Sequence, residues 1–229
     1  MPRLLLIETS TSLCSTALAE DGRIVCSRRS TEPRAHASLT AVFVKEMLEE
    51  SGWTVRELDA VAVSAGPGSY TGLRVGSSTA KGLCFGGQVP LIAVSTLDIL
   101  ARQAIEAGLP EGCKAILPMV DARRMEVYTA VYSPDGARLT DISPVILDEN
   151  SFADLFASGP VAVIGDAAEK FAPLRATADG SVFMQCCPEA SAMLVPAMRK
   201  YEKKEFEDTA YFEPFYLKQF IATTPKKLF

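Results

Sequence analysis

The chain has 229 residues, of which 48% are hydrophobic and 22% are charged, so it carries ample apolar surface for a folded core. This composition excludes disorder for most of the chain, because disordered segments are poor in apolar residues and strongly charged. The formal net charge of −5 argues against a protein that binds nucleic acid unaided, since such proteins usually present a basic face.

Apolar runs and turn signals predict alternating strands and helices in the first half of the chain. The run Leu4–Ile7 is apolar throughout, as in a strand covered on both faces, and Asp21-Gly22 signals a hairpin. Apolar residues three and four apart predict a helix over 38–51 that ends at Gly52. The predicted strands are 4–7, 13–19, a third beginning at 24, 60–64 and 89–94, and the other predicted helices are 70–85 and 95–107.

The second half repeats this order, which indicates a duplicated α/β unit. An apolar strand over 115–120 ends at Asp121, as the first strand ends at Glu8, and a threonine follows eight residues after each acid. Each following hairpin closes on Asp-Gly, and segment 161–166 resembles segment 61–66. We predict two similar α/β domains with mixed sheets that flank a cleft, at 1–108 and at 109–229 with a C-terminal helix and tail. Two unrelated α/β layers are the alternative.

The cysteines, the histidine count and the first residues bear on location and metal binding. The six cysteines include no Cys-x-x-Cys pair, and Leu4–Ile7 is too short for a signal-peptide core or a membrane span. We therefore expect reduced thiols, a cytoplasmic location and no contact with a membrane. His36 is the one histidine, which excludes sites built from several histidines, and we expect no metal and no cofactor.

Four strings of residues resemble one family. They are Glu8-Thr-Ser-Thr, Gly66-Pro-Gly-Ser-Tyr-Thr-Gly-Leu-Arg-Val-Gly, Thr79-Ala-Lys-Gly-Leu and Asp121-Ala-Arg-Arg-Met-Glu-Val-Tyr. These strings resemble the TsaB (YeaZ) family of the actin-like ATPase superfamily, and the likeness runs from residue 4 to about 217. It implies two duplicated actin-like, ribonuclease H-like domains.

The resemblance also implies a function. Members of this family are non-catalytic scaffolds or activators in the complex that forms N6-threonylcarbamoyladenosine in tRNA. Their partners are the catalytic paralogue TsaD and the ATPase subunit TsaE, and tRNA is expected to bind only through the complex. A self-sufficient ATPase or small-molecule kinase of the same fold is the alternative. A peptidase would need a metal or an activated nucleophile, and the sequence offers neither.

The resemblance places a degenerate nucleotide cleft between the domains. Superfamily ATPases hold Mg²⁺-nucleotide with an acid and small residues in two hairpin turns, where backbone N–H groups approach phosphate. The matching residues here are Glu8, Thr9 and Ser10 in one turn and Asp121 and Arg123 in the other. Glu8 replaces the family's usual aspartate, and an arginine fills space where a phosphate turn needs glycine. We expect a vestigial cleft, while binding of some anion is the alternative.

The loop 66–69 precedes the predicted helix 70–85. Its position suits an anion, because the free N–H groups of a helix N-terminus attract negative charge. It is not a Walker A motif, since Lys81 lies between Ala80 and Gly82. A tight turn with Ser69 as the helix N-cap is the alternative.

Small residues four apart mark one side of the helix 70–85. Gly72, Gly76 and Ala80 lie on one stripe, and each glycine inside a helix costs about 1 kcal/mol relative to alanine. Such a stripe lets another helix approach closely. We predict that it contacts the paralogue or a second copy of this chain, with Leu73, Val42, Phe43 and Met47 as apolar anchors. Packing inside the domain is the alternative.

Overall fold

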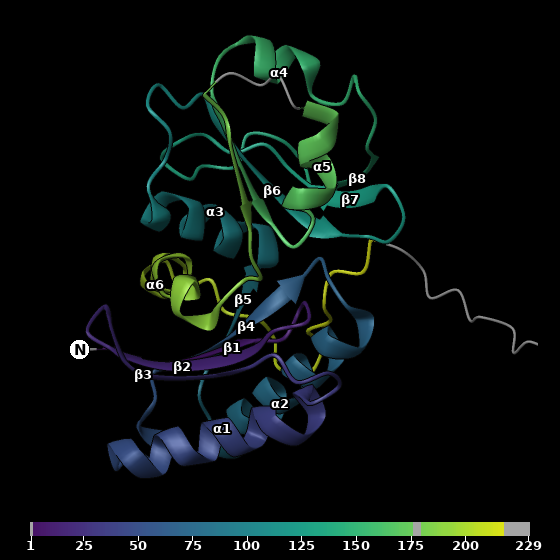
Figure 1. Cartoon of the computed structure of the whole chain (residues 1–229). Coiled ribbons are helices and arrows are strands. Elements are labelled where there is room, and N and C mark those ends of the chain that lie inside the picture. The colour runs from purple at the N-terminus through teal and green to yellow at the C-terminus, as the bar shows by residue number, and fades with distance from the viewer. Residues whose placement is uncertain (1, 176–179, 218–229) are drawn as a thin grey trace, which may run out of the picture.

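The computed structural model describes residues 2–175 and 180–217, and its first half folds as a five-stranded mixed sheet with helices (Figure 1). The strands are β1 (Arg3–Glu8), β2 (Cys14–Glu20), β3 (Arg23–Ser30), β4 (Ala60–Gly66) and β5 (Leu91–Ser95). The helices are α1 (His36–Ser51), the 3-10 helix η1 (Val55–Glu57), α2 (Tyr70–Gly87) and α3 (Thr96–Ala107). Strand β1 pairs antiparallel with β2 and parallel with β4, which gives the order β3-β2-β1-β4-β5.

The second half builds a sheet of the same topology. Its strands are β6 (Ala115–Asp121), β7 (Glu126–Thr129), β8 (Ser143–Ile146), β9 (Val161–Gly165) and β10 (Val182–Gln185), in the order β10-β9-β6-β7-β8. Its helical segments are α4 (Ala153–Ala157), α5 (Ala168–Phe171) and η2 (Ala172–Arg175), and η3 (Ala190–Met193) and α6 (Leu194–Glu202) follow. The central strand β6 corresponds to β1, its neighbours β7 and β9 correspond to β2 and β4, and the outer strands β8 and β10 correspond to β3 and β5. The predicted duplication is therefore confirmed.

Two serines fix the starts of the long helices, as capping rules predict. The Ser69 side-chain oxygen accepts a hydrogen bond from the Gly72 N–H at 3.3 Å and begins α2. The Ser95 oxygen accepts from the Leu97 N–H at 3.2 Å and begins α3. At the other end of α1, Gly52 adopts the left-handed conformation (φ 68°) that ends a helix.

The central strand β1 is buried on both faces of the first sheet. Leu5 and Ile7 point to the face covered by α1 and α2, where they join a core with Met47 and Ala80. Alternate residues, such as Leu6, point to the opposite face. Figure 1 shows α1 and α2 as the outer layer of the first sheet, on the side away from the second sheet. A continuous apolar run is the sequence that such a strand requires.

The C-terminal helix corrects the predicted division of the chain. The sequence prediction groups it with the second domain (109–229), but Leu194 and Ala197 of α6 pack against the first sheet, in one core with Leu4 and Ile92. The chain then passes along that sheet, where the Phe215 N–H donates to the Ala65 carbonyl oxygen at 2.7 Å. The boundary at residue 108 stays a prediction, and residues 218–229 of the predicted tail lie outside the described residues.

Helix α3 joins the two sheets. Leu97, Leu100 and Ala104 lie in a core with Ile116 of β6 and strand β9, while other residues of the same helix face the first sheet. No helix in the described part of the chain combines the length and the apolar character that a bilayer crossing requires.

Candidate functional site

The turn after β1 begins with buried residues, and two of its backbone N–H groups are already used within the chain. Glu8, Thr9 and Ser10 are each 0% exposed. The Ser10 N–H donates to the Glu8 Oε1 at 2.5 Å, and the Thr9 N–H donates to the Ser64 Oγ at 3.4 Å. A phosphate turn presents such N–H groups to its ligand. In this turn, side chains of the same domain take the place of a phosphate.

Helix α2 covers that turn at very short range. A Cβ atom added at Gly72 would lie 2.0 Å from the Thr9 carbonyl oxygen, and one at Gly76 would lie 2.3 Å from the Thr9 Oγ1. The same Oγ1 donates a hydrogen bond of 2.8 Å to the Gly72 carbonyl oxygen. Gly68 meets the neighbouring turn residue just as closely, with a Cβ position 2.3 Å from the Ser10 carbonyl oxygen. Gly72 and Gly76 of α2 are therefore required by this contact.

This packing corrects the predicted partner stripe. Gly72, Gly76 and Ala80 face the first domain's own turn and core instead of a second protein. Two of the predicted anchors are also internal, since Leu73 is 1% exposed and Met47 is 0% exposed. A surface that is filled from inside its own domain has no area left to offer a partner.

The Glu8 carboxyl group has a strongly altered acidity. Burial raises the pKa of Glu8 to about 7, although hydrogen bonds from Ser10 and Ser64 act in the opposite direction. Its Oε2 atom has no hydrogen-bond partner among the described residues. Burial therefore favours the neutral form of Glu8. A neutral, enclosed carboxyl is a poor ligand for Mg²⁺, which binds through ionised carboxylates.

The acid after β6 is held by a cation of its own domain. The Lys170 Nζ lies 2.7 Å from the Asp121 Oδ1, which also accepts a 2.6 Å hydrogen bond from the Arg123 N–H. The Asp121 N–H donates to the Asp166 Oδ1 at 2.8 Å. Burial raises the pKa of Asp166 to about 6. Asp121 is thus held by contacts within the second domain, whereas Glu8 uses only one of its two carboxyl oxygens in contacts with the described residues.

Metal ligands do not gather elsewhere in the described ranges. Residues 2–175 and 180–217 contain no group of three or more histidine, cysteine, aspartate or glutamate side chains placed to hold a metal ion. All six cysteines are free thiols.

The outer face of α1 and α2 carries apolar side chains without cover. Of the two remaining predicted anchors, Val42 is 44% exposed and Phe43 is half-buried. Phe85 is 85% exposed, and a Cβ atom at Gly82 or at Gly86 would meet no atom within 4 Å. The predicted anchors do not include Phe85, Gly82 or Gly86, although their spacing places all three together on α2.

Comparisons with known proteins agree with this architecture. Residues 29–179 match the family model described as TsaD, tRNA N6-adenosine threonylcarbamoyltransferase. The chain is 31% identical over 232 residues to the tRNA threonylcarbamoyladenosine biosynthesis protein TsaB of Escherichia coli, and the match covers 96% of each protein. It is 38% identical over 125 residues to TsaB of Haemophilus influenzae, covering 55% of this chain and 51% of that protein.

Solved structures show the same fold. The structure described as YeaZ from Pseudomonas aeruginosa matches with a TM-score of 0.78 and 27% identity, covering 95% of this chain and 100% of that one. An activator of 2-hydroxyisocaproyl-CoA dehydratase from Clostridium difficile, solved with bound ADPNP, matches with a TM-score of 0.51 and 9% identity, which shows the fold alone. The predicted actin-like fold is confirmed, and the chain belongs to the TsaB (YeaZ) family of the actin-like ATPase superfamily.

Proposed function

We propose that this chain is a cytoplasmic, non-catalytic subunit in the formation of N6-threonylcarbamoyladenosine in tRNA. The curated relatives that bear the TsaB name support the pathway. The non-catalytic role is supported by the first turn. There, the Thr9 and Ser10 N–H groups donate hydrogen bonds to side chains of the same domain. In this state neither of these two N–H groups is free to bind a nucleotide phosphate.

The surface that meets the catalytic paralogue TsaD is, in this proposal, the outer face of α1 and α2. Both helices pack on the first sheet with their inner sides, which leaves Val42 and Phe85 exposed to solvent. Gly82 and Gly86 leave open space beside them, so another helix can approach the α2 backbone closely. A second copy of this chain would use the same face and form an isologous dimer.

The ATPase subunit TsaE and tRNA join the assembly through the complex. The chain has 23 lysines and arginines against 28 aspartates and glutamates, so long-range electrostatics does not attract RNA to it. We expect no saturable binding of tRNA by the isolated chain at physiological ionic strength, and binding once TsaD is present.

Substitution of Phe85 tests the proposed surface. The variant Phe85→Asp places a charge on the exposed apolar face, and aromatic hot-spot residues of an interface typically contribute about 2 kcal/mol or more. The dissociation constant for purified TsaD should rise by more than about tenfold. The matched control is Ile146→Asp, because Ile146 is 73% exposed on β8 of the second domain. Equal affinity of both variants would reject the proposed face.

The alternative of a self-sufficient ATPase or kinase is tested with the isolated chain. We expect no ATP turnover above the buffer rate. Steady hydrolysis that is lost in Glu8→Ala or Asp121→Ala would assign a working site to the cleft and overturn the non-catalytic role.

A further inference from the structure

A crevice of about 220 Å³ lies where α3, α6 and the turn between β7 and β8 meet. Four cationic side chains from three parts of the chain line it: Arg102 on α3, Arg138 after the turn, and Arg199 and Lys200 on α6. Like charges repel, and the repulsion grows in a confined space with little water. Four cations around one small crevice, in a chain of net charge −5, therefore favour an anionic occupant.

Two carboxylates, Asp98 and Asp135, lie in the same walls and offset half of this charge. The Tyr132 hydroxyl donates a 2.5 Å hydrogen bond to the Asp98 Oδ1. The Ser133 hydroxyl donates to the Asp135 carboxylate and holds the pKa of Asp135 below its usual range. With both acids ionised, four cations against two carboxylates leave the crevice an excess of two positive charges.

Lys200 is the cation of the crevice that most clearly lacks a hydrogen-bond acceptor among the described residues. Its side chain is half-buried, yet its ammonium makes no hydrogen bond or ion pair with any residue that the structure describes. An ammonium has three donors, and desolvation without an acceptor is unfavourable. By contrast, the Arg102 Nε has an acceptor in Glu106 at 2.8 Å on the solvent side of α3.

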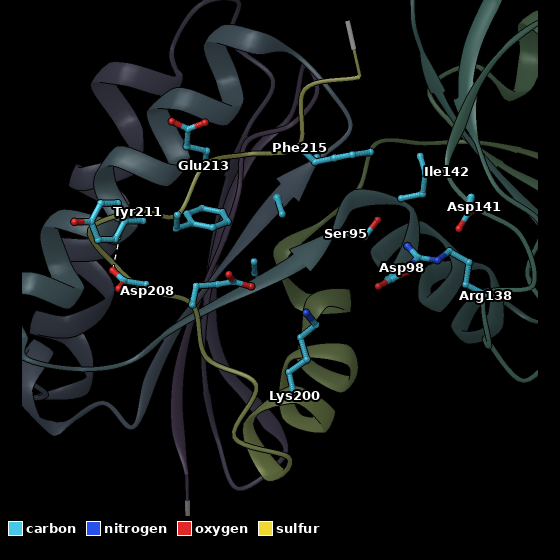
Figure 2. Close-up of a pocket in the computed structure, with 15 residues that line it drawn as sticks. Ser95, Asp98, Arg138, Asp141, Ile142, Lys200, Asp208, Tyr211, Glu213 and Phe215 are labelled. Carbon is cyan, nitrogen blue, oxygen red and sulfur yellow. Dashed lines mark hydrogen bonds between the residues drawn. The ribbon is translucent and has the colours of Figure 1, made fainter.

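A larger cavity, of about 770 Å³, continues from the crevice (Figure 2). Asp98, Arg138 and Lys200 line both spaces, so the two spaces share one cationic wall. In Figure 2, Lys200 extends from α6 and Arg138 from the second domain toward the space beside Asp98. The rest of the larger cavity combines apolar side chains, among them Phe215, with the carboxylates of the segment 207–213.

We propose that the crevice binds the phosphate group of a small phosphate monoester, whose organic part lies in the adjoining cavity. Arginine can bind phosphate oxygens through two parallel hydrogen bonds, and the Lys200 ammonium can donate a further hydrogen bond to the same phosphate. The carboxylates of the segment 207–213 can accept hydrogen bonds from hydroxyl or amino groups. A sugar fits this requirement as the organic part, so the expected ligand is a sugar phosphate. The combined volume is typical of a small-molecule site. This inference does not depend on the proposed function.

Binding of ribose 5-phosphate to the purified full chain tests the proposal. Calorimetric titration at constant ionic strength should give saturable one-to-one binding with a dissociation constant below about 1 mM, whereas free ribose should not bind. A charge-assisted hydrogen bond contributes enough that Lys200→Gln should weaken binding about tenfold. The matched control is Lys203→Gln, which removes the same charge one turn further along, outside the lining of the crevice.

Three results would overturn the proposal. One is no saturable binding of ribose 5-phosphate up to 10 mM or so, well above a typical small-ligand site. Another is equal weakening by the Lys200 and Lys203 variants, which would reflect net charge alone. The third is tighter binding of a short RNA oligonucleotide through these cations, which would make the crevice a nucleic-acid contact. If Lys200→Gln fails to fold, Arg199→Gln replaces it, since Arg199 is exposed and its loss removes no core packing. Affinity for TsaD is measured separately, so failure here leaves the proposed function untouched.

Discussion

Substitution of Gly72 by alanine should destabilise the first domain, although alanine is the better helix former. The new Cβ atom would lie 2.0 Å from the Thr9 carbonyl oxygen, far inside contact distance, and backbone on both sides resists the shift. Overpacking of this kind typically costs about 1–3 kcal/mol. The control is Gly82→Ala, at an exposed position of the same helix where nothing lies within 4 Å.

The comparison of these two variants isolates the steric cost. Both gain helix propensity, up to about 1 kcal/mol, so a lower free energy of unfolding for Gly72→Ala than for Gly82→Ala reports the contact with Thr9. Urea unfolding followed by circular dichroism should place Gly82→Ala above the unmodified chain and Gly72→Ala about 1–3 kcal/mol below Gly82→Ala. Stabilities within about 0.5 kcal/mol of each other would refute the assignment of the stripe to internal packing.

Two further predictions concern buried polar groups. Burial raises the pKa of Glu8 to about 7, so the native state retains a proton that the unfolded state releases above pH 4.5. The free energy of unfolding should fall as pH rises through this window, by roughly 3 kcal/mol, and Glu8→Gln should remove that slope between pH 5 and pH 8. Tyr132→Phe leaves the Asp98 carboxylate without its 2.5 Å donor and should cost about 1–3 kcal/mol in the same assay; an unchanged urea midpoint would contradict this.

The strands and helix starts could be predicted because local chemistry decides them. The run Leu4–Ile7 is apolar at every position, which suits a strand covered on both faces. Ser69 and Ser95 provide side-chain acceptors where helices need them. The duplication was also visible, because the acids Glu8 and Asp121 end equivalent strands.

The direction of the small-residue stripe could not be predicted. Spacing of Gly72, Gly76 and Ala80 shows that something approaches α2 closely, but not which neighbour. The neighbour is Thr9, more than sixty residues earlier in the chain. Helix α6 was misplaced for a related reason: the apolar residues that face the first sheet would suit the second sheet equally well.

Formation of N6-threonylcarbamoyladenosine in a reconstituted reaction with TsaD and TsaE tests most directly whether this chain contributes a surface and no catalytic cleft. The double variant Glu8→Gln, Asp121→Asn alters both cleft acids while keeping their shapes, and Phe85→Asp alters the outer face of α2. We predict a normal rate for the double variant and a loss of product with Phe85→Asp. Loss of product with the double variant, in a complex that still assembles normally, would contradict the non-catalytic role.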